Sequence, residues 1–221
     1  MEYSNSLLKS PSLSSQECGF NVFGNTKSSR VDRNYNLYQM MHLIKKGGDH
    51  LLFINALKGY CENQKEYTEI KSNLPLVSWN VVFDKKRSKK TMKSMSGYMY
   101  FEKSDMYPEE IGGFKNCLKS SPMITAVWKL AVGRGVGCLV RVCNVTPDNF
   151  IKAWNKIDRH MGMRFDMGSR RLMLTKMISY DPDLYVKHEA ESYEYVDWNS
   201  TSPYGFHRLH RHDNDYESYP N

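Results

Sequence analysis

The stretch ITAVWKLAVGRGVGCLVRVCNV, residues 124–145, determines most of what the sequence predicts about the fold. Residues 124–130 are rich in β-branched and aromatic side chains, which predicts a β-strand. The glycines at 133, 135 and 137 indicate a turn, because glycine tolerates positive φ and close backbone approach. Residues 138–145 predict a second strand with two alternating faces, Cys138, Val140 and Val142 on one and Leu139, Arg141 and Cys143 on the other. The stretch therefore predicts a β-hairpin with a basic, glycine-rich tip at Arg134.

This tip has two interpretations. Backbone N–H groups in a glycine-rich turn suit a phosphate or a nucleic-acid backbone, and Arg134 adds positive charge. A plain tight turn without a ligand fits the same residues.

The residues on either side of this hairpin predict helices and further strands. Thr146 and Pro147 predict the start of an amphipathic helix, and we expect its stripe of Phe150, Trp154, Ile157 and Met161 to be buried. Strands are expected at 20–23, 76–83, 96–105 and 172–180, and helices at 35–46, 49–59, 62–71 and 109–119. This order predicts an α+β fold in which an antiparallel sheet has helices packed on one face, plus a small N-terminal helical layer.

Length and composition restrict the class of protein. A chain of 221 residues with 13% aromatic and 40% hydrophobic residues can form one sizeable domain with an appendage, or two small domains. The five cysteines are scattered and form no CxxC, which favours buried, reduced thiols and argues against structural zinc. Neither a membrane-spanning run of ~20 apolar residues nor a signal peptide is evident. We therefore expect a cytoplasmic protein that does not enter a membrane.

The net charge of +7 is unevenly distributed. From Asp181 onward nine acidic residues accompany three basic ones, so this end carries −6 and residues 1–180 carry +13. A basic body favours a polyanionic partner, although a lysine-rich surface that only maintains solubility fits as well. Residues 1–18 and an acidic, tyrosine-rich tail at 188–221 are expected to be disordered, and the tail is a candidate docking segment for a protein partner.

The densest positive charge is the run at residues 85–93, which has six cations in nine residues. Because it joins two expected strands, it is a candidate for guiding a phosphate backbone; a solvated loop is the alternative. Its candidate contact residues are Lys85, Lys86, Arg87, Lys89 and Lys90.

Carboxylates at strand ends are candidate ligands for a hard cation. Glu102 lies at the end of the expected strand 96–105 and shares a face with Ser104, whereas Asp105 would point the other way if the strand continued. A single glutamate is more often a plain surface residue.

A series of segments, in order, has the spacing of a known family. The segments are FNVFGNTKSS (20–29), YTEIKSNLPLVSWNVVF (67–83), SGYMYF (96–101), AVGRGVG (131–137), FD (165–166) and SYDPDLY (179–185). Together they resemble the primase–polymerase-like domain at the N-terminus of VirE-type proteins of bacterial mobile elements, a divergent branch of the archaeo-eukaryotic primase superfamily. The resemblance covers about three quarters of the chain, from Phe20 to Tyr185.

This resemblance implies an RRM-like, primase-type sheet in a core at 76–187, preceded by a first strand and helical subdomain at 19–75. It implies nucleotidyl transfer with Mg²⁺ or Mn²⁺, with Glu102 and Asp166 as catalytic metal ligands. Arg134, Arg170 and Arg171 would contact phosphates. Nucleotides and single-stranded DNA or RNA would be the partners.

The sequence departs from the family where the chemistry is most demanding. Active relatives carry two aspartates where Glu102 and Ser104 stand here. They have a histidine or lysine at the position of Gly137 and an arginine at the position of Leu174. A lost anionic ligand weakens metal binding, and such sites do not tolerate errors of ~1 Å. We therefore expect a nucleic-acid-binding protein with a weakened catalytic site, acting in replication of a phage or mobile element. An active metal-dependent primase–polymerase and a structural or protein-interaction role are the alternatives.

Overall fold

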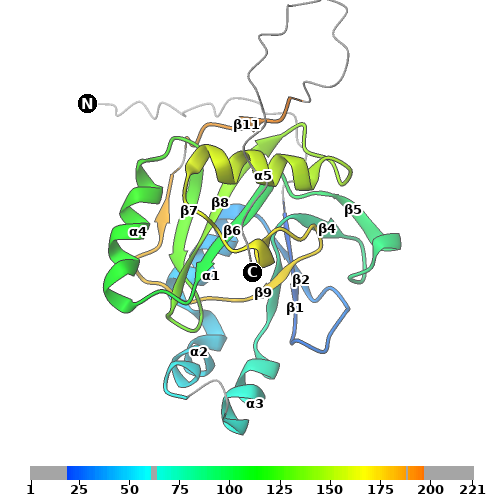
Figure 1. The fold of residues 1–221 in the computed structure, drawn as a ribbon. Helices are drawn as coiled ribbons and strands as arrows, with labels where there is room; N and C mark the ends of the chain where they lie inside the picture. Colours follow the sequence, from blue (N-terminus) through cyan, green and yellow to red (C-terminus); the bar gives the residue numbers. More distant parts are fainter. Residues whose placement is uncertain (1–18, 61–63, 188, 197–221) are drawn as a thin grey trace, which may run out of the picture.

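The computed structural model describes residues 19–60, 64–187 and 189–196 as an α+β fold built around one long antiparallel sheet (Figure 1). Its three main strands are β6 (Tyr98–Ser104), β7 (Ile124–Lys129) and β8 (Gly135–Cys143), with β8 in the middle. The short strand β10 (Tyr185–Val186) pairs antiparallel with β7. A last strand, β11 (Tyr193–Glu194), runs parallel to the end of β8.

The β7–β8 hairpin confirms the predicted strands but moves the turn. Strand β8 begins at Gly135, so Gly135 and Gly137 lie within the strand, opposite Ser104 and Glu102 of β6. A Cβ on Gly135 would lie 2.4 Å from the carbonyl oxygen of Lys103. Within the turn itself, Gly133 has φ 76°, which favours glycine. Two of the three glycines therefore permit close strand packing and do not form a phosphate-binding tip.

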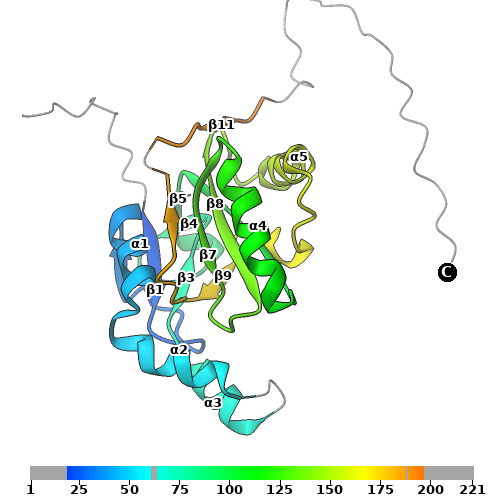
Figure 2. The same ribbon diagram turned by 90° about the vertical axis from the view of Figure 1, so that its left-hand side faces the viewer.

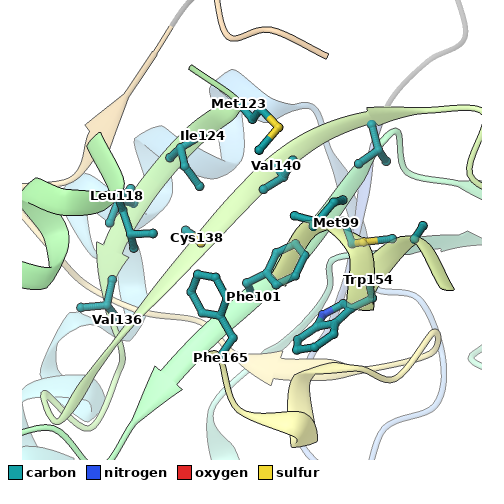
Figure 3. Packing of buried hydrophobic residues seen from close by; sticks show 14 of the residues in the cluster. Met99, Phe101, Leu118, Met123, Ile124, Val136, Cys138, Val140, Trp154 and Phe165 are labelled. Carbon is teal, nitrogen blue, oxygen red and sulfur yellow. The ribbon is translucent and has the colours of Figure 1, made fainter. Parts of the chain in front are cut away.

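Two helices, α4 (Pro108–Ser120) and α5 (Phe150–Met161), cover one face of this sheet (Figure 2). The face is apolar because alternate residues of β6 and β8, among them Phe101, Cys138 and Val140, point toward the helices. Phe101 lies between Trp154 and Phe165, with ring centroids 5.0 and 5.1 Å away (Figure 3). The buried stripe predicted for α5 is confirmed at Phe150, Trp154 and Ile157.

The start of α5 differs from the prediction. Asn149, not Thr146, precedes its first residue. The Asn149 side chain accepts a hydrogen bond from the Thr146 backbone N–H at 2.8 Å, which holds residues 146–149 as a turn before the helix.

The N-terminal part covers the opposite face of the sheet (Figure 2). It comprises β1 (Phe20–Phe23), β2 (Arg33–Tyr35), α1 (Leu37–Lys46), α2 (Leu51–Lys58) and α3 (Lys65–Asn73). Asn36 caps α1 and Gly47, with φ 82°, ends it. The predicted helical layer is therefore present. Its buried side chains pack against Tyr98, Tyr100, Trp128 and Leu139 of the long sheet.

The strand predicted at 76–83 is two strands in different sheets. β3 (Leu76–Ser78) lies between β1 and β9 (Thr175–Met177), whereas β4 (Val81–Phe83) pairs with β5 (Met92–Met95). The break at Asn80 is stabilised by its side chain, which accepts from the Tyr100 N–H at 2.9 Å and donates to the Arg171 carbonyl at 3.0 Å. The strand predicted at 172–180 is correspondingly limited to β9.

Several predicted boundaries can be placed on the fold. The sequence predicted a boundary between a part at 19–75 and a core at 76–187, but strand β1 of the first pairs with β3 of the second. Strand β11 and the buried Tyr195 lie within the segment predicted as a tail. Asp181, counted with that acidic end, is buried and pairs with Lys115. Residues 1–18 and 197–221, for which disorder was predicted, lie outside the described residues.

The cysteine prediction is confirmed for Cys138 and wrong for Cys117 and Cys143, whose side chains are exposed. Within the described parts of the chain, no helix has both the length and the apolar character needed to cross a membrane.

Candidate functional site

The candidate site lies where β6 ends, around Glu102. Although it is charged, Glu102 is only 5% exposed, because β6 places it opposite Gly137 and beneath β9. Its carboxylate accepts a hydrogen bond from the Tyr100 hydroxyl at 2.7 Å and contacts the Lys176 ammonium. Both carboxylate oxygens of Glu102 therefore have a partner within the protein.

Asp166, the second predicted ligand, lies next to the same strand. Its backbone N–H donates to the Glu102 carbonyl oxygen at 2.9 Å, which holds the two residues side by side. Its Oδ2 accepts from both the backbone N–H of Ser104, at 2.7 Å, and the Ser104 hydroxyl. Ser104 thus donates a hydrogen bond to Asp166, whereas an aspartate at this position would repel it.

The charge of Glu102 affects the tyrosine beneath it. Burial raises the pKa of the Tyr100 hydroxyl well above its usual value, and the Glu102 charge and hydrogen bond raise that pKa further. Tyr100 therefore stays protonated and acts as a hydrogen-bond donor. Its ring stacks on Trp79 at 5.7 Å, which fixes its orientation.

Glu102 lines a cavity of about 250 Å³ whose walls carry both signs of charge. Lys71, Arg134 and Lys176 supply the positive charge, and Glu102 and Asp105 the negative. Asp105 was expected to point away if the strand continued. Instead β6 ends at Ser104, and Asp105 takes φ 54°. Asp105 therefore lines this cavity, and its carboxylate oxygen lies 3.8 Å from the guanidinium of Arg134.

These side chains do not fit a pair of divalent cations. Among the described residues, no group of three or more His, Cys, Asp or Glu side chains is placed to hold a metal ion. Lys176 already neutralises Glu102, and Oδ2 of Asp166 already accepts hydrogen bonds from the Ser104 N–H and hydroxyl. Mg²⁺ and Mn²⁺ prefer several anionic or carbonyl oxygens, which this arrangement does not provide.

The structure divides the predicted phosphate-binding cations among separate places. Lys85, Lys86, Lys89 and Lys90 are exposed on the β4–β5 connection. Arg87 instead turns inward, where it donates to Thr175 Oγ1 at 2.5 Å and lies 5.5 Å from the Phe23 ring centroid. Arg87 therefore joins this connection to β9.

The remaining arginines have different surroundings. Arg134 lines the Glu102 cavity. Arg170 donates to the Asn155 side chain of α5 at 2.8 Å, whereas the Arg171 side chain is exposed. Arg134 therefore lies at the Glu102 cavity, whereas Arg87 and Arg170 have structural partners that the sequence did not predict.

Sequence reasoning also missed two residues of the site, Lys176 and Tyr100. Lys176 lies 74 residues from Glu102 along the chain, so no local pattern relates the two. Tyr100 does share the strand face of Glu102 by its two-residue spacing, and that signal was available.

Comparisons with protein-family models, with curated proteins and with solved structures give no match.

Proposed function

We propose that this protein binds single-stranded nucleic acid on a divergent primase–polymerase-like fold whose catalytic centre has lost its metal chemistry. The observation that carries the proposal is the Lys176 ammonium on Glu102, because a cation belonging to the protein occupies the carboxylate that a metal ion would need.

The order of elements supports the fold assignment. The run β6–α4–β7–β8–α5 places β6 and β7 on either side of β8, with both helices on one face. In an RRM-like β–α–β–β–α–β unit, the first, third and second strands lie side by side in the same way. The place beside β6 that a fourth strand would take is occupied by Asn80 and Asp166, which bond to the β6 backbone.

The charge distribution supports a polyanionic partner. The connection between β4 and β5 presents four exposed lysines, and Arg87 anchors it to Thr175, next in sequence to Lys176. Clustered exposed lysines without a carboxylate partner attract phosphate groups and release counterions. Nothing in this arrangement reads base sequence, so we expect binding that depends on salt more than on sequence.

The test is fluorescence anisotropy with labelled single-stranded DNA and RNA oligonucleotides over a range of salt concentrations. The variant Lys85→Gln/Lys86→Gln/Lys89→Gln/Lys90→Gln should weaken binding. It should also reduce the slope of log K against log salt by up to about 3, since each contact to single-stranded nucleic acid contributes about 0.7.

A matched control removes four cations elsewhere, on α3, α4 and α5: Lys65→Gln/Lys119→Gln/Lys152→Gln/Arg159→Gln. This control should keep most of the wild-type affinity and slope. Equal losses in both variants would show only a general effect of net charge and would overturn the proposed surface.

The catalytic part of the proposal is tested separately. Wild-type protein incubated with labelled nucleotides, Mn²⁺ and a single-stranded template should make no product. Incorporation that disappears in Asp166→Ala would overturn it and favour an active primase–polymerase.

A further inference from the structure

A second, larger cavity of about 600 Å³ lies between α1 and the long sheet. Tyr98 and Arg141, which are opposite each other in β6 and β8, line it. Glu102 lies four residues further along β6, about 13 Å away at 3.3 Å per residue. The two cavities are therefore at opposite ends of the same strand pair.

The Lys and Arg side chains that line this cavity give it a positive charge. Lys45, Lys46, Arg141 and Lys187 line it, and none of the described residues that line it is Asp or Glu. Lys45 and Lys46 are exposed in the last turn of α1, and Arg141 is half-buried in β8. Within the described chain, these three side chains form no salt bridge. As far as the described residues show, the cavity is therefore positively charged without a balancing carboxylate, which favours an anionic ligand.

Aromatic side chains form the rest of the wall. Tyr38 is 74% exposed and stacks on His42, with ring centroids 6.4 Å apart. Tyr98 and Tyr185 line the same space. A flat ring in the ligand could stack on such a surface, and cations combined with aromatic rings suit a ligand that joins a base to phosphate.

A buried hydroxyl in the wall points to a polar ligand atom independently of the charges. The pairing of β7 with β8 shifts register between Ile124 and Ala126, so Thr125 lies in a β-bulge. Its carbonyl accepts from the Lys187 N–H at 2.8 Å. Its hydroxyl, in a residue that is 3% exposed, has no hydrogen-bond partner among the described residues. Buried hydroxyls normally have a partner, and Thr125 is among the residues that line the cavity.

We propose that this cavity is a nucleotide-binding site. Lys45, Lys46 and Arg141 bind the phosphates, Tyr38 stacks on the base, and the Thr125 hydroxyl hydrogen-bonds a polar atom of the ligand. The volume lies within the range of small-molecule sites. The inference is independent of the proposed nucleic-acid surface, because it uses neither the β4–β5 lysines nor Glu102.

The test is isothermal titration calorimetry of the full chain with ATP, tripolyphosphate and adenosine in buffer containing EDTA. ATP should bind at least ten times more tightly than either fragment, since the site recognises both ends of the nucleotide. Lys45→Gln/Lys46→Gln should weaken ATP at least tenfold. Tyr38→Ala should weaken ATP severalfold and leave tripolyphosphate binding unchanged. The control Lys65→Gln/Arg159→Gln, at two exposed cations on α3 and α5 that do not line this cavity, should bind ATP like wild type.

Thr125→Val provides a second measurement, by thermal denaturation. It removes the unpartnered hydroxyl at nearly constant shape, so the free protein should melt at the same temperature or higher while the ATP-induced rise in Tm becomes smaller. The proposal is overturned if ATP does not bind, if tripolyphosphate binds as tightly as ATP, or if Lys45→Gln/Lys46→Gln binds ATP like wild type.

Discussion

The Lys176 ammonium of β9 lies directly against the Glu102 carboxylate of β6, at the position where the family resemblance places a metal ligand. The lysine is one-third exposed, whereas the glutamate side chain is 6% exposed. The Lys176 ammonium and the Tyr100 hydroxyl therefore stabilise the negative charge of the buried Glu102 carboxylate.

Replacing Lys176 by methionine should lower the free energy of unfolding by about 2 kcal/mol, because it leaves a buried carboxylate without its cation. Urea denaturation at pH 7 measures the effect. Glu102→Gln/Lys176→Met should recover most of the loss, since no unpaired charge remains. A double variant less stable than Lys176→Met would contradict this account of the pair.

Adding a carboxylate beside Glu102 and Asp166 should create a metal site. Ser104→Asp/Lys176→Ser places a third carboxylate beside Glu102 and Asp166 and removes the competing ammonium. Mn²⁺ should then raise the Tm of the variant, because it relieves repulsion in the folded state, and leave the wild-type Tm unchanged. An equal rise in wild type would show that the natural site already binds the ion.

The buried pair of Lys115 and Asp181 should matter more to stability than any surface charge. Its Nζ–Oδ2 distance is 2.6 Å, both side chains are less than 10% exposed, and Asp181 also accepts from the Lys129 N–H. Asp181→Ala should lower the free energy of unfolding by about 3–5 kcal/mol, because Lys115 remains buried without a counter-charge. Asp183→Ala, two residues away and exposed, should change it by less than about 0.5 kcal/mol in the same urea experiment.

Two glycine-to-alanine substitutions should change the free energy of unfolding in opposite directions. In Gly135→Ala, the new Cβ would meet the backbone of Lys103 and Ser104 at 2.4 and 2.9 Å, so β6 and β8 must separate. We expect Gly135→Ala to lower the free energy of unfolding by about 3 kcal/mol. Gly112→Ala, in α4 with nothing within 4 Å of the new Cβ, should gain about 0.5–1 kcal/mol. Thermal denaturation of both variants measures these changes in stability. Similar shifts in Tm for the two variants would refute the packing role of Gly135.

Tyr100 should make the protein sensitive to alkali. Because burial and Glu102 raise the folded-state pKa of Tyr100, its stabilising contribution is complete below the unfolded value of about 10 and is lost as pH rises above it. Between pH 10 and 11, urea denaturation should show a steeper loss in wild type than in Tyr100→Phe, by up to about 1.4 kcal/mol per pH unit. Identical slopes would show that Tyr100 ionises equally easily in both states.

Local patterns anticipated much of the fold. Alternation along residues 124–145 correctly assigned Val140 and Leu139 to opposite faces of the sheet, because successive side chains of a strand must alternate. The helix predicted at 35–46 ends where α1 ends, and Gly47 follows it at positive φ, a conformation that glycine adopts freely. The break at Asn80 was not predictable, because its hydrogen-bond partners Tyr100 and Arg171 belong to distant segments.

The same division applies to the site. Strand period and composition are local properties, so they were enough to predict that Glu102 and Ser104 share a face of their strand and that residues 1–180 are basic. Three contacts could be known only from the folded chain: Lys176 neutralises Glu102, Ser104 bonds to Asp166, and Thr125 lines a positively charged cavity. These contacts join residues up to 74 positions apart, and they form only when separate sheets and helices pack together.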